Sequence, residues 1–542
     1  MSMDDLLQWA RVNKKWHYAV IPYIWRDMST LTKSQHKRLV RMIIDDYRRV
    51  QTGGSPSSLA KYCPLIRTFG TISDPKDAKD EYSSILLRFV QRDKKISPDD
   101  KESTAQSIFH HFMVHCTHLQ TLMLDLSDSG SYEPAKAVAD TRAQQLRQLT
   151  IRGSLNDEGF KSLLSRCSTT MEVLYIYSTP PVKNSNHPAI EVDEAEQEQL
   201  SSLRRLFLIC CPEHDADRLR SIWGRCKSLQ ELVFVRCDLA FLKLTANLVE
   251  KSLPNLRSIA LGPDTNEFDL EDKDLACLLS ASQLGWRSIQ IMGYRNLGAL
   301  SWRVLFRNTP KIWRFTMVKW YGQNDDKLME ILLTSPWLQK LVTLQDGVID
   351  YPRIISIDAN EWIRRKPSIG PIAPLPCGSF LTDLRIKISD IPRPDVTHDR
   401  NGEKRRSSVN ESYPGEGQKI QRQVYERLSN FVLLEVLWLG SNSYYCQSAD
   451  LHHKKVADHQ YECLEMSLES GLDQLEGMKR MKILNVSLME TRIGQKEAQW
   501  MAEHWPKLRE IHGLENRGDA KKARQWIKEN SPRISAPFLS TK

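Results

Sequence analysis

Apolar residues recur along the chain in the order apolar-x-x-apolar-x-apolar. Successive triplets are 25 to 32 residues apart over more than two hundred residues, a period close to that of leucine-rich repeats. Chance matches would not keep such even spacing. The regular triplets begin at Leu119, Leu146, Met171, Leu203, Leu229, Leu256, Trp286, Ile312 and Leu338.

Two further signals recur in the same register as the triplets. An apolar pair typical of a helix, such as Leu163-Leu164 or Leu278-Leu279, lies five to seven residues upstream of most triplets. The turn into each predicted strand carries a small thiol or a helix-stopping proline. These turn residues are Cys116, Cys167, Cys226, Pro254, Pro310, Pro336 and Pro506. Cys211 and Cys237 follow their strands, where such repeats place a side chain that satisfies loop backbone groups.

Each repeat therefore predicts a helix, a turn and a strand, and no single repeat could bury its own apolar face. The predicted fold is an α/β solenoid: a leucine-rich-repeat horseshoe with a parallel β-sheet on its concave face and helices on its outer side. A short all-α segment precedes it.

Changes in the pattern divide the chain into four predicted regions. Residues 1–50 form the short helical segment, and residues 51–346 form the regular repeat array. Residues 347–516 hold irregular repeats, with triplets at Leu381, Leu434 and Met481 and a polar stretch at 391–423 that predicts a mobile loop. Residues 517–542 predict a basic helix and a tail.

The first thirty residues have apolar positions at helical spacing, and Pro22 predicts a break between two short helices. Their pattern resembles the second half of an F-box, beginning inside the motif and without its first helix. Asn13 stands where that family usually has cysteine. The matching residues are Asp5, Leu6, Leu7, Val12, Asn13, Lys14, Trp16, Ile24, Trp25 and Arg26.

Together with the repeats, this segment resembles F-box/leucine-rich-repeat proteins, particularly the fungal ones. The resemblance implies a substrate-recognition adaptor of an SCF-type (Skp–cullin–F-box) ubiquitin ligase, with a Skp-type adaptor and a cullin ligase as partners. Candidate adaptor-binding residues are Leu6, Leu7, Val12, Trp16, Ile21, Ile24 and Trp25. The alternatives are that these residues are only core, and that the protein is a non-catalytic repeat scaffold that no longer engages the ligase.

Strand residues between the triplet positions point away from the predicted core. Three neighbouring repeats place a mostly apolar set there, which predicts a site for a client protein. The candidate client-binding residues are Tyr175, Tyr177, Arg205, Phe207, Ile209, Val233 and Val235. An alternative is that the insertion at 180–199 covers them. Later repeats carry Arg314, Lys340, Arg385 and Lys387 there, either an anion-binding stretch or a solvated face.

Composition adds few restrictions. The 542 residues include 76 Lys and Arg against 67 Asp and Glu, a net charge of +9. Over this length the charge gives a mildly basic surface that indicates no particular partner, and we do not expect a nucleic-acid-binding protein. No apolar run reaches the length of a membrane span, and no signal peptide is evident, so we expect a cytoplasmic or nuclear protein. The eleven cysteines contain no C-x-x-C pair and predict no disulfide framework or zinc module.

No catalytic motif or phosphate-binding loop occurs, and we expect neither enzymatic activity nor a cofactor. His111 and His115 form the best metal candidate because they share a helix face at i, i+4 spacing. Their neighbours Phe112, Met113 and Cys116 occupy repeat core positions, however, so we predict no metal site.

Overall fold

The computed structural model describes the chain in segments. These are residues 11–28, 31, 33–55, 61–69, 101–125, 134–141, 143–153, 158–178, 199–213, 215–262, 271–292, 297–318, 325–343, 356–363, 375–391, 393, 415–440, 463–487, 489, 491–514 and 518–537. The chain divides into two compact units. Unit 1 comprises residues 1–256 and 281–284, and unit 2 comprises residues 257–280 and 285–542.

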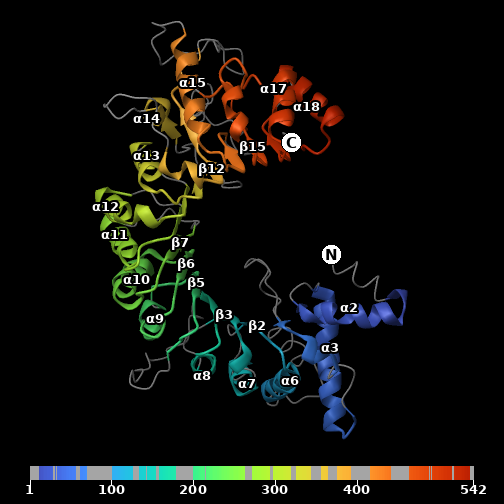
Figure 1. The fold of residues 1–542 in the computed structure, drawn as a ribbon. Helices are drawn as coiled ribbons and strands as arrows, with labels where there is room; N and C mark the ends of the chain where they lie inside the picture. Colours follow the sequence, from blue (N-terminus) through green and yellow to red (C-terminus); the bar gives the residue numbers. More distant parts are fainter. Residues whose placement is uncertain are drawn as a thin grey trace, which may run out of the picture. The chain divides into compact units, whose positions relative to one another are not determined.

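In the described residues of unit 1, six parallel strands follow one another in chain order (Figure 1). Equivalent triplet residues are register neighbours: Leu122 pairs with Leu149, and the line continues through Leu174, Leu206 and Leu232. The strands are β1 (Thr68–Phe69), β2 (Thr121–Asp125), β3 (Gln148–Gly153), β4 (Val173–Ser178), β5 (Arg205–Ile209) and β6 (Glu231–Val235).

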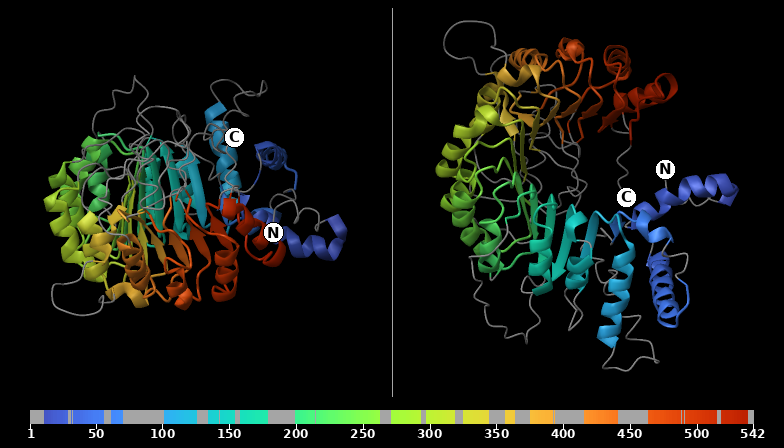
Figure 2. Two further views of the ribbon diagram at one scale, coloured as in Figure 1. Left: turned by 90° about the horizontal axis from the view of Figure 1, so that it is seen from above. Right: turned by 60° about the horizontal axis from the view of Figure 1, so that its bottom comes forward.

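The repeat helices of unit 1 lie together on one side of its strands (Figure 2). The triplet side chains point to this side, and Leu149, Leu174 and Leu206 have no exposed surface. Burying a leucine side chain contributes roughly 1.5–3 kcal/mol. We call the other side of the strands the open face; it carries Tyr175, Phe207 and their register neighbours. The helices are α6 (Lys101–His115), α7 (Pro134–Thr141), α8 (Glu158–Arg166), α9 (Asp215–Trp223) and α10 (Leu239–Ser252).

Unit 2 repeats the same arrangement with shorter strands. Its parallel ladder runs through β7 (Ser258–Leu261), β8 (Ser288–Met292), β9 (Arg314–Val318), β10 (Lys340–Val342), β12 (Asp383–Arg385), β14 (Val436–Trp438), β15 (Ile483–Asn485) and β16 (Glu510–His512). A separate two-stranded sheet pairs β11 (Ser356–Asp358) with β13 (Lys387–Ser389).

The helices of unit 2 become irregular toward its C-terminal end. They are α11 (Asp272–Ser280), α12 (Ala299–Asn308), α13 (Asp325–Thr334), α14 (Ala359–Ile363), α15 (Glu416–Leu428), α17 (Gln495–His504) and α18 (Gly518–Asn530). Short 3-10 helices η8 (Pro376–Ser379) and η10 (Leu472–Gly477) stand in two repeats where longer helices would otherwise lie. In both units, parallel strands follow one another in chain order with helices between them. The predicted α/β solenoid is confirmed.

The N-terminal segment forms α2 (Lys14–Arg26) and α3 (Lys33–Gln51), and it caps the first strand. Arg67 N donates to Arg26 O at 2.9 Å, and Asp27 forms a parallel bridge with Thr68 of β1. At the other end of the chain, Ser535 forms a parallel bridge with Glu510 of β16. Chain segments outside the repeats therefore pair with both terminal strands.

Three local predictions need correction. Pro22 lies inside the continuous helix α2, and the helical pattern breaks instead at Asn13, between helical residues 11–12 and α2. Residues 416–423 of the predicted mobile loop belong to α15, and residues 394–414 lie outside the described part of the chain. The triplet at Leu119 is not the first: β1 precedes it within the predicted array 51–346, and buried Cys63, Ile66 and Phe69 occupy the core positions there. The domain boundaries stay predictions.

No helix in the described ranges combines the length and apolar character needed to cross a bilayer. The basic helix predicted near the C-terminus is present as α18, which packs on α17. The segment after it is not a free tail throughout, because Ile534 is buried beside the Ser535 bridge.

Asp272 at the start of α11 caps the neighbouring helix α12. Its carboxylate accepts the backbone N–H groups of Gly298 and Leu300 at 2.9 Å and of Ser301 at 3.0 Å. Burial tends to raise the pKa of this carboxyl, but the hydrogen bonds from Ser301, Leu300 and Gly298 outweigh it and lower the pKa. A Cβ at position 298 would collide with the carboxylate, so glycine is required there.

We predict that Asp272→Ala destabilises unit 2 by about 1–2 kcal/mol, because three N–H groups of α12 lose their acceptor. The folded-state pKa lies below the unfolded value of about 3.9, so this contribution is complete above that pH and is lost as pH falls through the folded pKa. Urea-induced unfolding of the wild type and Asp272→Ala should converge on acidification. Asp272→Asn, which keeps one acceptor oxygen, should lie between them at neutral pH. A difference that is independent of pH would contradict the assignment.

Candidate protein-binding surface

The seven candidate client-binding residues lie together on the open face of unit 1. Tyr175 and Tyr177 of β4 are register neighbours of Phe207 and Ile209 of β5. Phe207 and Ile209 in turn pair with Val233 and Val235 of β6, and Arg205 pairs with Glu231. We call these seven residues the β4–β6 patch: Tyr175, Tyr177, Arg205, Phe207, Ile209, Val233 and Val235.

The centre of the patch is a stacked aromatic pair. The ring centroids of Tyr175 and Phe207 are 4.2 Å apart, with 14° between the ring planes. Stacking of this kind fixes both rings and adds about 0.5–1.5 kcal/mol to the energy of area burial. Partial burial raises the pKa of Tyr175, against an opposing effect of the Arg205 charge. The phenol therefore stays neutral at physiological pH and can donate a hydrogen bond.

The residues of the β4–β6 patch differ in solvent exposure, from Arg205 as the most exposed to Ile209 as the least. Arg205 is exposed, and Tyr175, Tyr177, Phe207, Val233 and Val235 are half-buried. Ile209 is buried, with 8% of its surface accessible. The insertion that we considered as a cover lies outside the described residues except for Gln199, so both the contact and the cover interpretations remain open.

The candidate adaptor-binding residues fall into two groups in the structure. Val12 is 64% exposed and Trp16 is 45% exposed, whereas Ile24 is buried with Val20. Ile21 and Trp25 pack against that cluster, and Trp25 stacks on Tyr62 with centroids 5.0 Å apart. Leu6 and Leu7 lie outside the described residues.

Two features of α2 were missed in the sequence. Asn13 caps the helix, because its side-chain oxygen accepts the Trp16 N–H at 3.0 Å. Tyr23, two helical turns after Trp16, is 62% exposed and lies on the same side of the helix. Asparagine followed by a helical run was a usable N-cap signal, and the i, i+7 spacing of two aromatic residues was another.

The histidine pair chosen as the metal candidate has a structural role. His111 Nε2 is 3.2 Å from Oδ2 of Asp46, a fully buried carboxylate on α3. The His111 ring also meets the rings of Tyr47 and His115 edge-on, at centroid distances of 5.8 and 4.8 Å. Within the described ranges, no group of three ligating side chains is assembled. The His111–Asp46 contact connects the N-terminal helices to the first long repeat helix.

The cysteines at repeat positions are buried and inert. Burial raises the pKa of the Cys167 and Cys226 thiols to about 12, far from a reactive range. Cys237 Sγ lies 3.3 Å from Leu208 O, and Cys211 Sγ lies 3.8 Å from Ile209 O. Both cysteines therefore contact backbone groups, as predicted, but these are carbonyls at the end of strand β5 and not loop groups.

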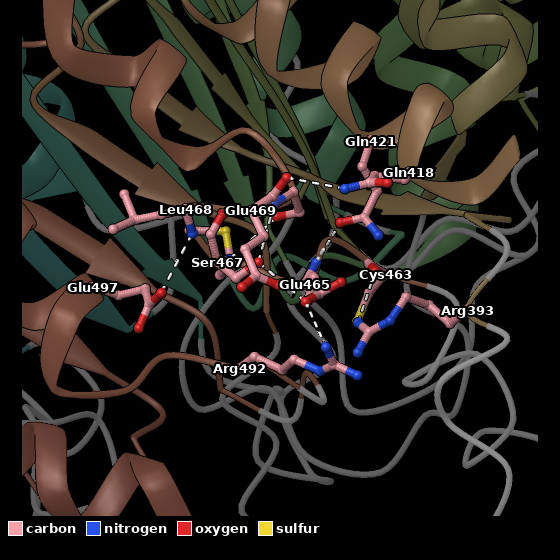
Figure 3. A network of polar contacts seen from close by, with 12 residues as sticks. Arg393, Gln418, Gln421, Cys463, Glu465, Ser467, Leu468, Glu469, Arg492 and Glu497 are labelled. Carbon is pink, nitrogen blue, oxygen red and sulfur yellow. Dashed lines mark hydrogen bonds and ion pairs between the residues drawn. The ribbon is translucent and has the colours of Figure 1, made fainter. Parts of the chain in front are cut away.

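In unit 2, a polar network replaces regular helical packing in the repeat before β15 (Figure 3). It holds the segment 463–470. Gln421 of α15 accepts Glu465 N at 2.9 Å, Arg492 reaches the Glu465 carboxylate at 3.3 Å, and Arg393 donates to Cys463 O at 3.3 Å. The network fixes the return of the chain into the ladder.

Comparisons with known proteins give weak matches. No family model matches the chain, and no curated protein matches it. One similar solved chain comes from the crystal structure of the Rad7 and Elc1 complex in yeast, at 13% identity and a TM-score of 0.36; the match covers 86% of this chain and 98% of that one.

A second similar structure is the leucine-rich-repeat ectodomain of the plant membrane receptor kinase GASSHO1/SCHENGEN3 from Arabidopsis thaliana, in complex with Casparian strip integrity factor 2. It has 9% identity and a TM-score of 0.29, and the match covers 74% of this chain and 48% of that chain. At these values neither comparison carries an argument about function. The fold assignment rests on the strand order and register described above.

A substitution at Tyr425 of α15 can measure how strongly the polar network stabilises segment 463–470. The fully buried Tyr425 hydroxyl accepts Met466 N at 3.0 Å, and burial raises its pKa. We predict that Tyr425→Phe leaves this N–H without an acceptor, at a cost of about 1–3 kcal/mol. Amide hydrogen exchange at 463–471 should accelerate by about fivefold to a hundredfold. Tyr23→Phe, at an exposed position, should change nothing, and equal effects of the two variants would refute this role.

Proposed function

We propose that this protein is the substrate-recognition adaptor of an SCF-type ubiquitin ligase and that it binds a client protein on the open face of its repeats. The observation that carries the proposal is the alignment of aromatic and aliphatic side chains from three strands in the β4–β6 patch. A contiguous apolar patch rimmed by polar residues is typical of a protein-binding site.

The physical character of the patch supports a polypeptide ligand. The backbone that carries these side chains is held by hydrogen bonds between parallel strands, so little backbone conformational entropy is lost when a ligand binds. The Tyr175–Phe207 stack and Tyr177 offer broad apolar surface with hydroxyl groups, the kind of side chain that dominates protein interfaces. Arg205 supplies an exposed charge at its border.

The N-terminal helices support the second half of the proposal. Val12, just before α2, and Trp16 and Tyr23 on it are exposed, while Val20, Ile21, Ile24 and Trp25 form the packed side of α2. An exposed apolar helix side is suited to docking against partner helices. The F-box resemblance covers this segment, and the partner that it implies is a Skp-type adaptor. In such a complex the protein itself performs no chemistry, and ubiquitin transfer to the client depends on proximity.

A second candidate function is a repeat scaffold without a ligase. The observation that favours it is the bridge between Asp27 and Thr68, because this bridge uses the N-terminal segment to cover the first strand of the ladder. A segment whose role is to cap needs no adaptor. Under both functions the open face binds a client protein. They differ in whether a Skp-type adaptor also binds α2.

We predict that Tyr177→Ala combined with Phe207→Ala preserves the fold and reduces client capture more than tenfold, because two partly exposed aromatic anchors are lost. Quantitative affinity purification of the full chain from its own cells, compared with the wild type, measures capture. Leu244→Ala on α10 is the control, since it removes an exposed apolar side chain from the helix side. If the double variant is insoluble, the two rings belong to the core. If it folds and client capture is unchanged, the β4–β6 patch is not the client-binding site.

The adaptor prediction is tested separately. Co-expression of the chain with a Skp-type adaptor should give a stoichiometric complex in size-exclusion chromatography. Trp16→Asp combined with Val12→Asp should abolish the complex, because charges would replace the exposed apolar surface of the helix. Val432→Asp, at a position that is 48% exposed in unit 2, should leave it intact. If the wild-type chain forms no complex, the scaffold function is favoured.

A further inference from the structure

Two positive side chains face each other on the open face of unit 2. Arg314 of β9 and Lys340 of β10 are direct register neighbours, on strands that lie about 4.8 Å apart in a parallel sheet. Like charges placed directly opposite one another destabilise a sheet. In the described part of the chain, neither side chain forms an ion pair or a side-chain hydrogen bond.

The carboxylate in register beside Lys340 is already bound by another arginine. Asp383 of β12 is the other register neighbour of Lys340. Its two oxygens accept Arg385 Nε at 2.9 Å and Arg385 Nη2 at 3.1 Å. The Arg385 guanidinium also lies over the Trp438 ring, 4.2 Å from its centroid. The Asp383–Arg385 pair is therefore internally neutral, and the charges of Arg314 and Lys340 remain uncompensated.

Unused hydrogen-bonding groups lie beside these charges. Arg314 Nε is buried and has no hydrogen-bond partner in the described residues. Thr316, the next open-face residue of β9, is 4% exposed, and its hydroxyl also lacks a partner there. Buried polar groups without partners cost free energy, and an acceptor that reached between the side chains of β9 and β10 would satisfy both atoms. Lys387, which the sequence placed in the same basic stretch, lies instead in the separate β11–β13 sheet.

We propose that Arg314, Lys340 and Thr316 form an oxyanion-binding site that takes a phosphate or carboxylate group of a polypeptide client. An oxyanion between the two cations would neutralise their repulsion, and charge-assisted hydrogen bonds from Arg314 are among the strongest in proteins. Half-exposed Val436, further along the ladder, supplies apolar surface for the chain that carries the anion. This inference rests on the proposed function, since it assumes a client on the open face.

The test uses the immobilised full-length protein and peptide libraries with one fixed central residue, either phosphoserine, phosphothreonine, glutamate or serine. We expect the wild type to retain at least one acidic library about tenfold over the serine library, and to lose this preference in high salt. Arg314→Ala combined with Lys340→Ala should reduce acidic retention to the serine level. Thr316→Val should reduce it several-fold, because the hydroxyl is lost without a change of shape.

The control is Arg303→Ala combined with Arg307→Ala, which removes the same charge from exposed positions on α12. Retention of the phosphorylated libraries alone assigns the site to phosphate, and retention of the glutamate library assigns it to carboxylate. Equal retention of acidic and serine libraries, or an equal loss in the control, would overturn the site. If the preference for acidic libraries is absent but client capture still depends on Tyr177 and Phe207, the anion site is refuted and the proposed function stands. If client capture does not depend on Tyr177 and Phe207 either, both proposals are refuted.

Discussion

The structure depends on the hydrogen-bonded register between consecutive parallel strands. Each repeat supplies one short strand whose backbone groups can be satisfied only by the strands before and after it. The register places Leu149, Leu174 and Leu206 side by side, so one continuous core replaces many small ones. Side chains alternate along a strand, and burying the triplets therefore sends the residues between them to the opposite face.

The same constraint provides the chemistry of the open face. In unit 1, it stacks Tyr175 on Phe207, although the two residues are separated by a long insertion. In unit 2, it sets Arg314 against Lys340 and Asp383 beside both Lys340 and Val436. A ladder of this kind accepts almost any residue at open-face positions because the core does not depend on them. Those positions can therefore hold a client surface without a large loss of stability.

Ladders have ends, and an exposed strand edge invites pairing with other chains. In this protein, Asp27 bridges to Thr68 and Ser535 bridges to Glu510. The N-terminal segment therefore has two separable parts. Ile24 and the residues packed around it belong to the protein core, and Val12, Trp16 and Tyr23 remain exposed. The N-terminal segment thus supports the ladder on one side and leaves apolar side chains exposed on another.

The sequence by itself determined the repeat, the buried triplets and the residues that share the open face, because these follow from local periodicity. It also placed the β4–β6 patch correctly on neighbouring strands. The tertiary structure alone decided which side chains find partners: Asp383 binds Arg385, His111 meets Asp46, and Asp272 caps a helix that begins a full repeat later. The helical pattern breaks at Asn13 and not at Pro22, because the Asn13 side chain accepts the Trp16 N–H as an N-cap, while α2 continues through Pro22. Pairing of this kind depends on distances between residues far apart in the chain, which no local pattern contains.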